Sequence, residues 1–158
     1  MYNHAPENYD CLFCKIAKGI EDEAIWNRQS DVFYQTEHIT AMINPRWWPN
    51  NNGNVMIIPN QHIENIYDMP PETHTRIYEA ARQVAIAFKQ VHGCDGVSTR
   101  QHNEPGGLQE VFHYHLHVFP RYFNDYLYDL THHHRVTTPA ERLPYVEKLK
   151  AYFDGLHS

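Results

Sequence analysis

A chain of 158 residues with 42 % apolar and 13 % aromatic side chains fits one water-soluble domain that buries a sizeable core. Its formal net charge of −6 disfavours a nucleic-acid-binding protein, because such proteins need a basic face to release counterions. A mean hydropathy of −0.66 argues against a membrane protein. The first residues lack a signal-peptide pattern, so we expect a cytoplasmic location.

The first half of the chain predicts short elements separated by polar turns. Residues 1–10 are expected to form a loose lead-in, and residues 13–18 a short helix that ends at Gly19. Residues 44–53 predict a loop, because Pro, Asn and Gly are frequent in them. Short strands are expected around this loop, at residues 24–27, 32–35, 39–43 and 54–59.

One long helix is the clearest element of the second half. Asp68 and the prolines that follow it fit a helix N-terminus. Apolar residues then recur at helical spacing from Ile77 to Val91, and Gly93 is expected to end the helix. A second, shorter helix is expected after Pro144.

Two further strands are expected at residues 97–101 and 113–121, on either side of a polar loop with two adjacent glycines. Strands therefore outnumber helices, and short turns connect them. This combination predicts an α+β domain with a mainly antiparallel sheet. We expect residues 1–158 to form a single domain, in which residues 124–158 are a C-terminal tail that carries the shorter helix.

Three histidines alternate with apolar residues in the last of these strands. Successive side chains of a strand point to opposite faces, so His113, His115 and His117 are expected to share one face. The opposite face then carries Phe112, Tyr114, Leu116 and Val118. A row of three imidazoles can bind a phosphate, transfer protons, hold a metal or attack an electrophile. The alternative, a half-buried strand whose polar face happens to be histidine, is disfavoured by the regular alternation.

Two of the three cysteines, Cys11 and Cys14, are spaced C-x-x-C. Three cysteines do not make a disulfide framework, and in a reducing compartment this spacing indicates metal or redox chemistry. Two thiolates at this spacing suit tetrahedral zinc, which needs two more ligands from elsewhere in the chain. Reduced thiols that simply pack are the alternative. A redox role is disfavoured, because no thioredoxin-like βαβ pattern surrounds the pair.

Residues 113–119, read as His-φ-His-φ-His-φ-φ with φ apolar, resemble the signature of the histidine triad (HIT) nucleotide hydrolases and transferases. Residues 11–16, 55–63 and 100–111 are similar to further segments of the bacterial, zinc-bearing branch of that family. The resemblance implies a HIT-like α+β fold with about five antiparallel strands, one long helix and one short helix. It also implies a homodimer.

The same resemblance assigns roles within the triad and in the loop before it. It implies His115 as the nucleophile, His117 as a group beside the phosphoryl oxygens, and the main-chain carbonyl of His113 as the group that orients the nucleophile. Gln109 matches the family glutamine that contacts the phosphate. Glu110 is a candidate for proton delivery to the leaving group, with a solvated loop position as the alternative.

The resemblance also completes the ligand set of the zinc site. In zinc-bearing bacterial relatives, the histidine after the central strand and the first histidine of the triad join the two cysteines. These positions match His62 and His113 in this chain. Together with Cys11 and Cys14 they imply a structural zinc that fastens the N-terminus to the catalytic strand.

The chain departs from the family pattern in the segment expected to bind ribose and in the loop after it. Many family members carry Asp-Ile-Asn-Pro, whereas this chain has Met42 at the acidic position, so Asn44 is the candidate replacement. Trp47 and Trp48 in the longer loop predict either a stacking wall for a flat ligand or packing in the core or at a subunit interface. The packing interpretation is the favoured one.

Further polar residues near the triad have two interpretations each. His102 and Asn103 either bind the phosphate of the substrate or order the loop that contains them. An anionic substrate needs a local positive patch against the overall negative charge, and Arg100 and Arg121 are available cations. The histidines of residues 132–134 are interpreted as a solvated loop in preference to a metal site.

The resemblance to the HIT family implies an enzyme that hydrolyses a nucleoside phosphate derivative at the α-phosphorus through a nucleotidyl-histidine intermediate. Dinucleoside polyphosphates, nucleoside phosphoramidates and adenylylated compounds all fit as substrates. One alternative is nucleotidyl transfer to a sugar phosphate, although the related transferases carry a His-Pro-Gln arrangement that this chain lacks. The other is a nucleotide-binding module with vestigial activity, which the missing ribose-binding acid favours.

Overall fold

The computed structural model describes residues 2–156 and has a five-stranded sheet at its centre. All neighbouring strands of this sheet run antiparallel. In spatial order the strands are β1 (Val32–Gln35), β2 (Ile39–Ile43), β4 (Val55–Pro59), β6 (Leu116–Arg121) and β5 (Gly96–Gln101). The predicted α+β fold class is therefore confirmed.

Three α-helices pack against the sheet: α1 (Leu12–Ala17), α2 (Pro71–Ala87) and α3 (Pro139–Gly155). The predicted long helix is confirmed, since α2 has a proline in its first turn and continues through a turn of π-helix at Phe88–His92. Gly93 ends it with a φ of 63°, a left-handed conformation that favours glycine. Among residues 2–156, none of the helices combines the length and apolar character that crossing a membrane requires.

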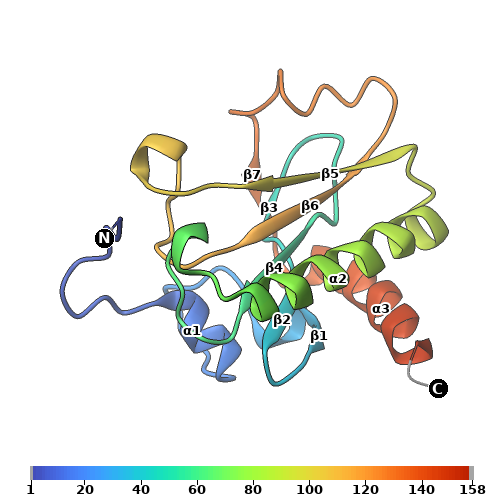
Figure 1. The fold of residues 1–158 in the computed structure, drawn as a ribbon. Helices are drawn as coiled ribbons and strands as arrows, with labels where there is room; N and C mark the ends of the chain where they lie inside the picture. The colour runs from blue at the N-terminus through green and yellow to red at the C-terminus, as the bar shows by residue number, and fades with distance from the viewer. Residues whose placement is uncertain (1, 157–158) are drawn as a thin grey trace.

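The two central strands bury both of their faces. Every residue of β2 and β4 is buried. Ala41 and Ile57 lie in a large core with residues of α2 and α3, whereas the adjacent Met42 and Ile58 lie in a second core with residues of α1. Figure 1 accordingly shows α2 and α3 beside each other and α1 apart from them. Because successive side chains of a strand point to opposite faces, neighbouring residues of β2 and β4 contribute to different cores.

The C-terminal helix begins earlier than predicted, at Pro139 and not after Pro144, and with 17 residues it is as long as α2 and not shorter. Thr138 and Glu141 form a capping box, in which the Thr138 side chain accepts a hydrogen bond from the Glu141 N–H. Pro144 lies inside the helix but is exposed, so water can solvate the carbonyl that loses its partner. The capping pattern is therefore the better start signal in this segment.

Residues 24–27 form turns instead of the predicted strand. The Ile25 N–H donates to the Asp22 carbonyl, and the buried Ile25 side chain packs in the core with α1. Unpredicted small elements complete the fold: the two-stranded sheet β3 (Arg46–Trp47) and β7 (Arg135–Val136), and the 3-10 turns η1 (Gln29–Asp31), η2 (Ile66–Asp68) and η4 (Pro105–Gly107).

The N-terminal lead-in has neither helix nor strand between residues 2 and 10, and it runs along the loops near the triad. The main-chain N–H groups of His4 and Ala5 donate to the Glu64 carboxylate. The Tyr9 hydroxyl accepts a hydrogen bond from the Phe112 N–H, and the two rings pack 5.9 Å apart. Phe112 therefore packs on the lead-in, whereas Tyr114, with which it was predicted to share a face, packs in the large core.

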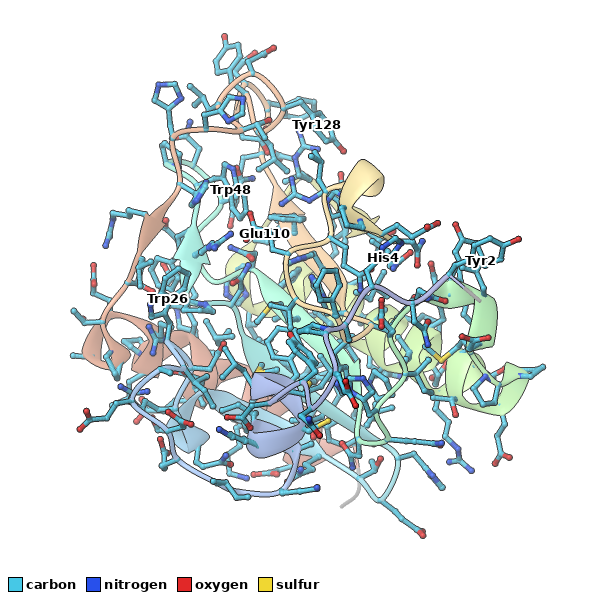
Figure 2. All side chains as sticks on the ribbon, turned by 90° about the vertical axis from the view of Figure 1, so that its left-hand side faces the viewer. Tyr2, His4, Trp26, Trp48, Glu110 and Tyr128 are labelled. Carbon is cyan, nitrogen blue, oxygen red and sulfur yellow. The ribbon has the colours of Figure 1, made fainter. Side chains whose placement is uncertain are left out.

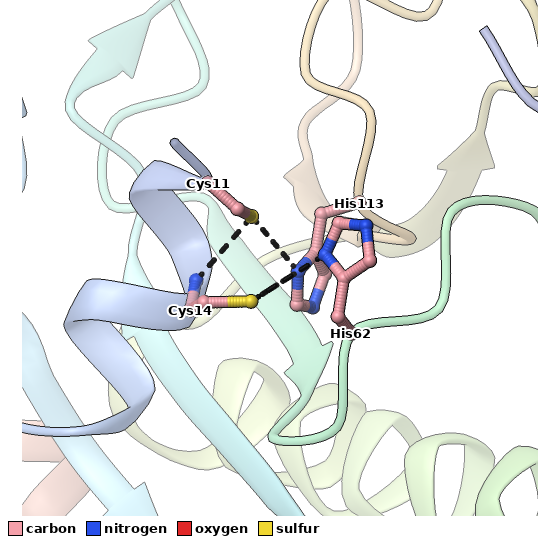
Figure 3. Close-up of side chains that lie close together, drawn as sticks. All are labelled: Cys11, Cys14, His62 and His113. Carbon is pink, nitrogen blue, oxygen red and sulfur yellow. Dashed lines mark hydrogen bonds between the residues drawn. The ribbon is translucent and has the colours of Figure 1, made fainter. Parts of the chain in front are cut away.

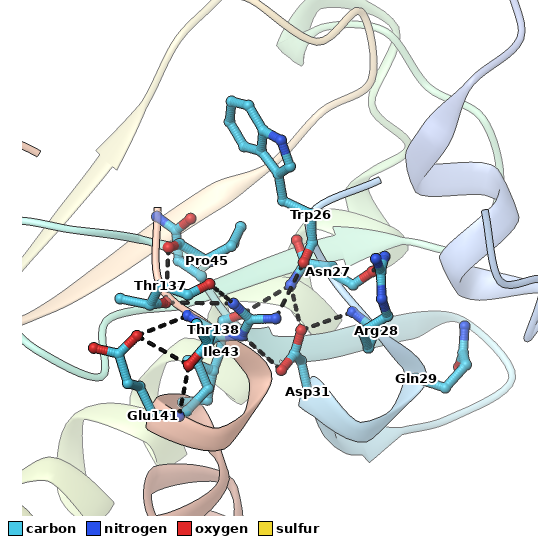
Figure 4. A network of polar contacts seen from close by, with 12 residues as sticks. Trp26, Asn27, Arg28, Gln29, Asp31, Ile43, Pro45, Thr137, Thr138 and Glu141 are labelled. Carbon is cyan, nitrogen blue, oxygen red and sulfur yellow. Dashed lines mark hydrogen bonds and ion pairs between the residues drawn. The ribbon is translucent and has the colours of Figure 1, made fainter. Parts of the chain in front are cut away.

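A buried ion pair fixes the start of α3 against the segment before β1 (Figure 4). Arg142 and Asp31 are 0 % and 1 % exposed, and Nε of the arginine lies 2.7 Å from the carboxylate. The Arg142 guanidinium also donates to the carbonyls of Thr137 and Trp26. Thr137 in turn donates to the Pro45 carbonyl, which places this network directly beside the loop that follows β2.

Candidate active site and metal centre

The three histidines lie on one side of the chain, as the alternation predicts. Phe13 of α1 packs edge-on against the rings of His113 and His115, at centroid distances of 5.8 and 5.3 Å. The rings of His115 and His117 are 5.1 Å apart. Tyr114 lies in the opposite core, although β6 begins only at Leu116.

The His115 ring is held in one tautomer. Its Nδ1–H donates to the main-chain carbonyl of His113 at 2.8 Å, which leaves the lone pair on Nε2 free. Burial lowers the pKa of His115 to about 4, so the ring is neutral at pH 7. The residue as a whole is 7 % exposed. Such an imidazole can act as a nucleophile.

His117 is next to Asn44, the predicted ribose-binding residue. The Asn44 amide nitrogen lies 3.4 Å from His117 Nδ1 and 2.8 Å from the side-chain oxygen of Asn54. Burial, with the positive charges near it, holds the pKa of His117 well below its usual range, so its ring is also neutral. An amide that donates to Nδ1 leaves the ring proton on Nε2, where it can be donated to a ligand oxygen.

Gln109 is buried, and its side-chain amide bonds the main chain of the surrounding loop. Its NH₂ group donates to the carbonyls of Glu64 and Val111, at 2.6 and 3.1 Å. Its oxygen accepts a hydrogen bond from the Glu104 N–H at 2.8 Å. Both amide protons are thus occupied, and Gln109 orders the loop in this conformation.

His102 and Asn103 also make bonds that order this loop. His102 Nδ1 lies 2.6 Å from the Gly107 carbonyl. Asn103 accepts a hydrogen bond from the Ile66 N–H at 2.8 Å and exchanges two more with the Gln101 side chain. These contacts match the loop-ordering interpretation of the two residues.

Glu110 is exposed and forms an ion pair with Arg46 at 2.5 Å. Arg46 also lies over the ring of Trp26, 4.9 Å from its centroid. Figure 2 shows Glu110 and Trp26 on the same side of the molecule. The pair joins the loop before the triad to β3, and so it connects two segments that border the histidines.

The two tryptophans pack in the interior, in agreement with the favoured interpretation. Trp47 meets Tyr145 of α3 edge-on at 4.9 Å. Trp48 meets Phe119 at 5.3 Å and donates its indole N–H to the Thr131 carbonyl. The exposed histidines 132–134 follow in the same outer loop.

Cys11, Cys14, His62 and His113 converge on one point (Figure 3). Their ligand atoms all lie within 4.8 Å of one another. Cys11 Sγ lies 3.2 Å from His113 Nδ1, and Cys14 Sγ lies 3.4 and 3.5 Å from the Nδ1 atoms of His62 and His113. This group could hold a metal ion.

The donor set and its spacing fit a tetrahedral ion. Zinc bond lengths place a sulfur and a nitrogen ligand about 3.6 Å apart, close to the distances between these side chains. His113 Nε2–H donates to the Pro59 carbonyl at 2.9 Å, so Nδ1 is the free nitrogen and faces the sulfurs. Burial and the neighbouring Cys11 raise the pKa of the Cys14 thiol to about 12, which a bound cation would reverse.

Neither Phe13 nor the Pro59 carbonyl was singled out in the sequence, although both position the histidines. Phe13 lies between the two cysteines of the C-x-x-C spacing, and a short helix there brings its ring onto the triad. Pro59 ends the central strand, whose pairing with β6 sets the distance between them. Only the folded arrangement reveals these contacts, because they join residues far apart in sequence.

A model of the HIT domain matches residues 27–124. The chain belongs to the HIT domain family. Protein Hit of Bacillus subtilis is 33 % identical over 75 % of this chain and 74 % of its own length. A bis(5′-adenosyl)-triphosphatase of Dictyostelium discoideum is 27 % identical over 60 % of this chain and 62 % of its own length, so the HIT family includes nucleotide hydrolases.

Solved HIT structures share the fold of this chain over nearly all of its length. A zinc-bound histidine triad protein from Mycobacterium smegmatis superposes with a TM-score of 0.74 at 25 % identity. The alignment covers 94 % of this chain and 96 % of the other. The expected HIT-like fold is therefore confirmed.

Proposed function

We propose that the protein hydrolyses a nucleoside phosphate derivative at its α-phosphorus through a covalent intermediate on His115. The observation that carries this proposal is the bond from His115 Nδ1–H to the His113 carbonyl, which leaves Nε2 bare beside His117. Family members that are nucleotide hydrolases support the reaction class.

The reaction would proceed in two displacements. The Nε2 lone pair of His115 forms a bond to the α-phosphorus while the bond to the leaving group breaks, and the leaving group takes a proton from water. Glu110, which is paired with Arg46 as a carboxylate, has no proton to donate in this conformation. Water then attacks the same phosphorus, gives up a proton, and releases the nucleotide with His115 restored. His117 Nε2–H, whose ring is oriented by Asn44, would donate to a phosphoryl oxygen as negative charge builds.

Turnover of fluorogenic nucleotide substrates by the wild type and His115→Ala tests the proposal. We expect the wild type to hydrolyse at least one substrate and the variant to lose at least about a thousand-fold in kcat, because the covalent route is closed. His133→Ala, which removes an exposed imidazole from the outer loop, is the matched control and should keep full activity. Unchanged turnover in folded His115→Ala would overturn the proposed nucleophile.

The second candidate is a nucleotide-binding module with little activity. Two features favour it: Met42 replaces the acid of the family pattern described above, and both amide protons of Gln109 are already bonded. Nucleotide binding without turnover, in a protein whose His115 ring is reactive, would select this candidate. Transfer to a sugar phosphate has no such support.

We also propose that Cys11, Cys14, His62 and His113 hold a structural zinc. The donor set, the distances and the zinc-bound relative support this proposal. A bound zinc would supply a positive charge and a fixed link between the start of α1 and the catalytic segment. Metal analysis of protein purified without chelator tests it. Metal-free protein with two freely reactive thiols would refute it.

The homodimer and the cytoplasmic location stay expectations of the family resemblance and of the sequence. Light scattering on the purified protein measures the first. One chain has a mass of 18.7 kDa, and we expect a measured mass of about twice that value.

A further inference from the structure

Arg100 extends from the edge strand of the sheet toward the triad. In the antiparallel pair of β5 and β6, Arg100 is the direct partner of His117. Directly paired residues point to the same face of a sheet, with Cβ atoms about 4.5–5.5 Å apart. Arg100 therefore lies on the histidine face, one strand away from His117.

Two aromatic rings hold the Arg100 guanidinium in place. Its central carbon lies 4.8 Å from the ring centroids of both Trp48 and Phe119. Phe119 is also stacked on the His117 ring, at 5.8 Å and 24°. Aromatic faces attract the positive charge but accept few hydrogen bonds, so the N–H groups of the guanidinium stay available.

Arg100 differs in this respect from every other arginine of the chain. Near the site, Arg46 is paired with Glu110 and Arg121 with Asp125. The remaining arginines bond a carboxylate or a main-chain carbonyl. Within residues 2–156 the Arg100 side chain makes no hydrogen bond or ion pair, and its Nε is buried without a partner.

An unpaired cation that is partly removed from water is unfavourable unless an anion binds to it. The chain carries a net charge of −6 and nevertheless keeps this guanidinium free of its own carboxylates. The planar fork of an arginine matches the oxygens of a phosphate, to which it can donate two parallel hydrogen bonds. The two aromatic rings hold the guanidinium in position before the ligand binds, so less conformational entropy is lost on binding.

We infer that Arg100 binds a phosphate that follows the α-phosphate of the substrate, and that the enzyme prefers nucleotides whose leaving group carries phosphate. This inference rests on the proposed function, in which His117 contacts the α-phosphoryl group. It favours dinucleoside polyphosphates and related anhydrides over nucleoside phosphoramidates, whose amine leaving group offers no second phosphate. Arg100 is thus a specificity-determining residue.

Two substrates with the same adenylyl group and different leaving groups test the inference. One is diadenosine triphosphate, which releases ADP, and the other is a fluorogenic adenosine phosphoramidate, which releases an amine. Arg100→Met keeps an apolar stem between the rings and removes the charge, whereas Arg100→Lys keeps the charge without the fork. Arg76→Gln, on the exposed side of α2, removes the same charge far from the triad and is the matched control.

For Arg100→Met we expect kcat/KM on diadenosine triphosphate to fall about 10- to 100-fold, the range for a lost charge-assisted hydrogen bond. The phosphoramidate should change by less than about three-fold, because it makes no such bond. For Arg100→Lys we expect a kcat/KM on diadenosine triphosphate between those of the wild type and of Arg100→Met. Arg76→Gln should have the same kcat/KM as the wild type on both substrates. Equal losses on both substrates, or no loss on diadenosine triphosphate, would overturn the inference.

A binding measurement separates this inference from the proposed reaction. In the His115→Ala background, calorimetry should show tighter binding of ADP than of AMP, and the added Arg100→Met change should remove that difference. If His115→Ala still turns over substrate, the proposed reaction fails while this binding test still decides the role of Arg100. A preference for ADP that survives Arg100→Met in a folded protein contradicts the inference.

Discussion

His113 connects the two sites of this protein through different parts of one residue. Its ring faces Cys11 and Cys14, and its main-chain carbonyl accepts the proton of His115 Nδ1. The ring and the carbonyl belong to the same residue, so a shift of the main chain at His113 would move both of them. A metal ion at the cysteines would hold this carbonyl in place without touching the substrate.

The Cys14→Ser variant tests the proposed zinc site at the scale of a single residue. Loss of one thiolate should abolish retention of zinc through dialysis and lower the melting temperature by roughly 5 °C, which corresponds to about 2 kcal/mol for a chain of this size. Metal analysis and thermal unfolding measure both effects. Cys94→Ser, a buried thiol outside the cluster, should keep the metal. Equal metal content in the two variants would contradict the prediction.

At the scale of the structural elements, the buried carboxylate of Asp125 organises the turn that follows β6. Asp125 is 4 % exposed and pairs with Arg121 through two bonds of 2.6 and 2.8 Å. It also accepts hydrogen bonds from the Asn51 side chain and from the N–H groups of Tyr122 and Leu127. These donors hold the pKa of Asp125 well below its usual range.

The lowered pKa of Asp125 predicts that the free energy of unfolding depends on pH. Because the folded pKa of Asp125 is lower than the unfolded value of about 3.9, its contribution is complete above that pH and is lost as the pH falls further. Asp125→Asn should therefore cost about 3 kcal/mol at pH 7, and the difference from the wild type should shrink below about pH 4.

Urea unfolding of both proteins between pH 7 and pH 3 measures that difference. Asp154→Asn is the matched control, since it removes a carboxylate from an exposed pair with Lys150 and should cost no more than about 0.5 kcal/mol. A loss for Asp125→Asn that is the same at every pH would show that the pair is not the source of the stability.

For the molecule as a whole, the Arg142–Asp31 pair links the last helix to the 3-10 turn η1, directly before the first strand. Both charges are buried, and their network reaches the Pro45 carbonyl beside Asn44. The C-terminal helix therefore supports the loop on which Asn44 approaches His117. The part of the chain beyond the matched HIT domain thus contributes to the site indirectly.

Replacement of one partner should destabilise the whole fold. Asp31→Asn leaves the Arg142 charge buried without a counter-charge, and we expect a loss of about 3–5 kcal/mol in the free energy of unfolding. The double variant Asp31→Leu with Arg142→Met removes both charges and should recover much of this loss. Chemical unfolding of the two variants is the measurement. A single variant within about 1 kcal/mol of the wild type would contradict the buried pair.

The sequence by itself determined what depends on local spacing. The period of two places the three histidines on one side, and the period of 3.6 predicts the long helix, which Gly93 ends after the π-helical turn that follows α2. Both follow from backbone geometry, which is the same in any environment. Weaker local signals led to errors: the strand predicted at residues 24–27 does not form, and the last helix begins at Pro139 and not after Pro144.

Only the tertiary structure decided burial, partners and charge state. The lowered pKa of His115, the occupied amide of Gln109 and the free guanidinium of Arg100 all depend on residues that lie far away in the sequence. Arg100 and Arg121 look alike in the sequence, yet Asp125 neutralises one of them and no carboxylate reaches the other. Electrostatic energy depends on distances in space, and the fold sets those distances.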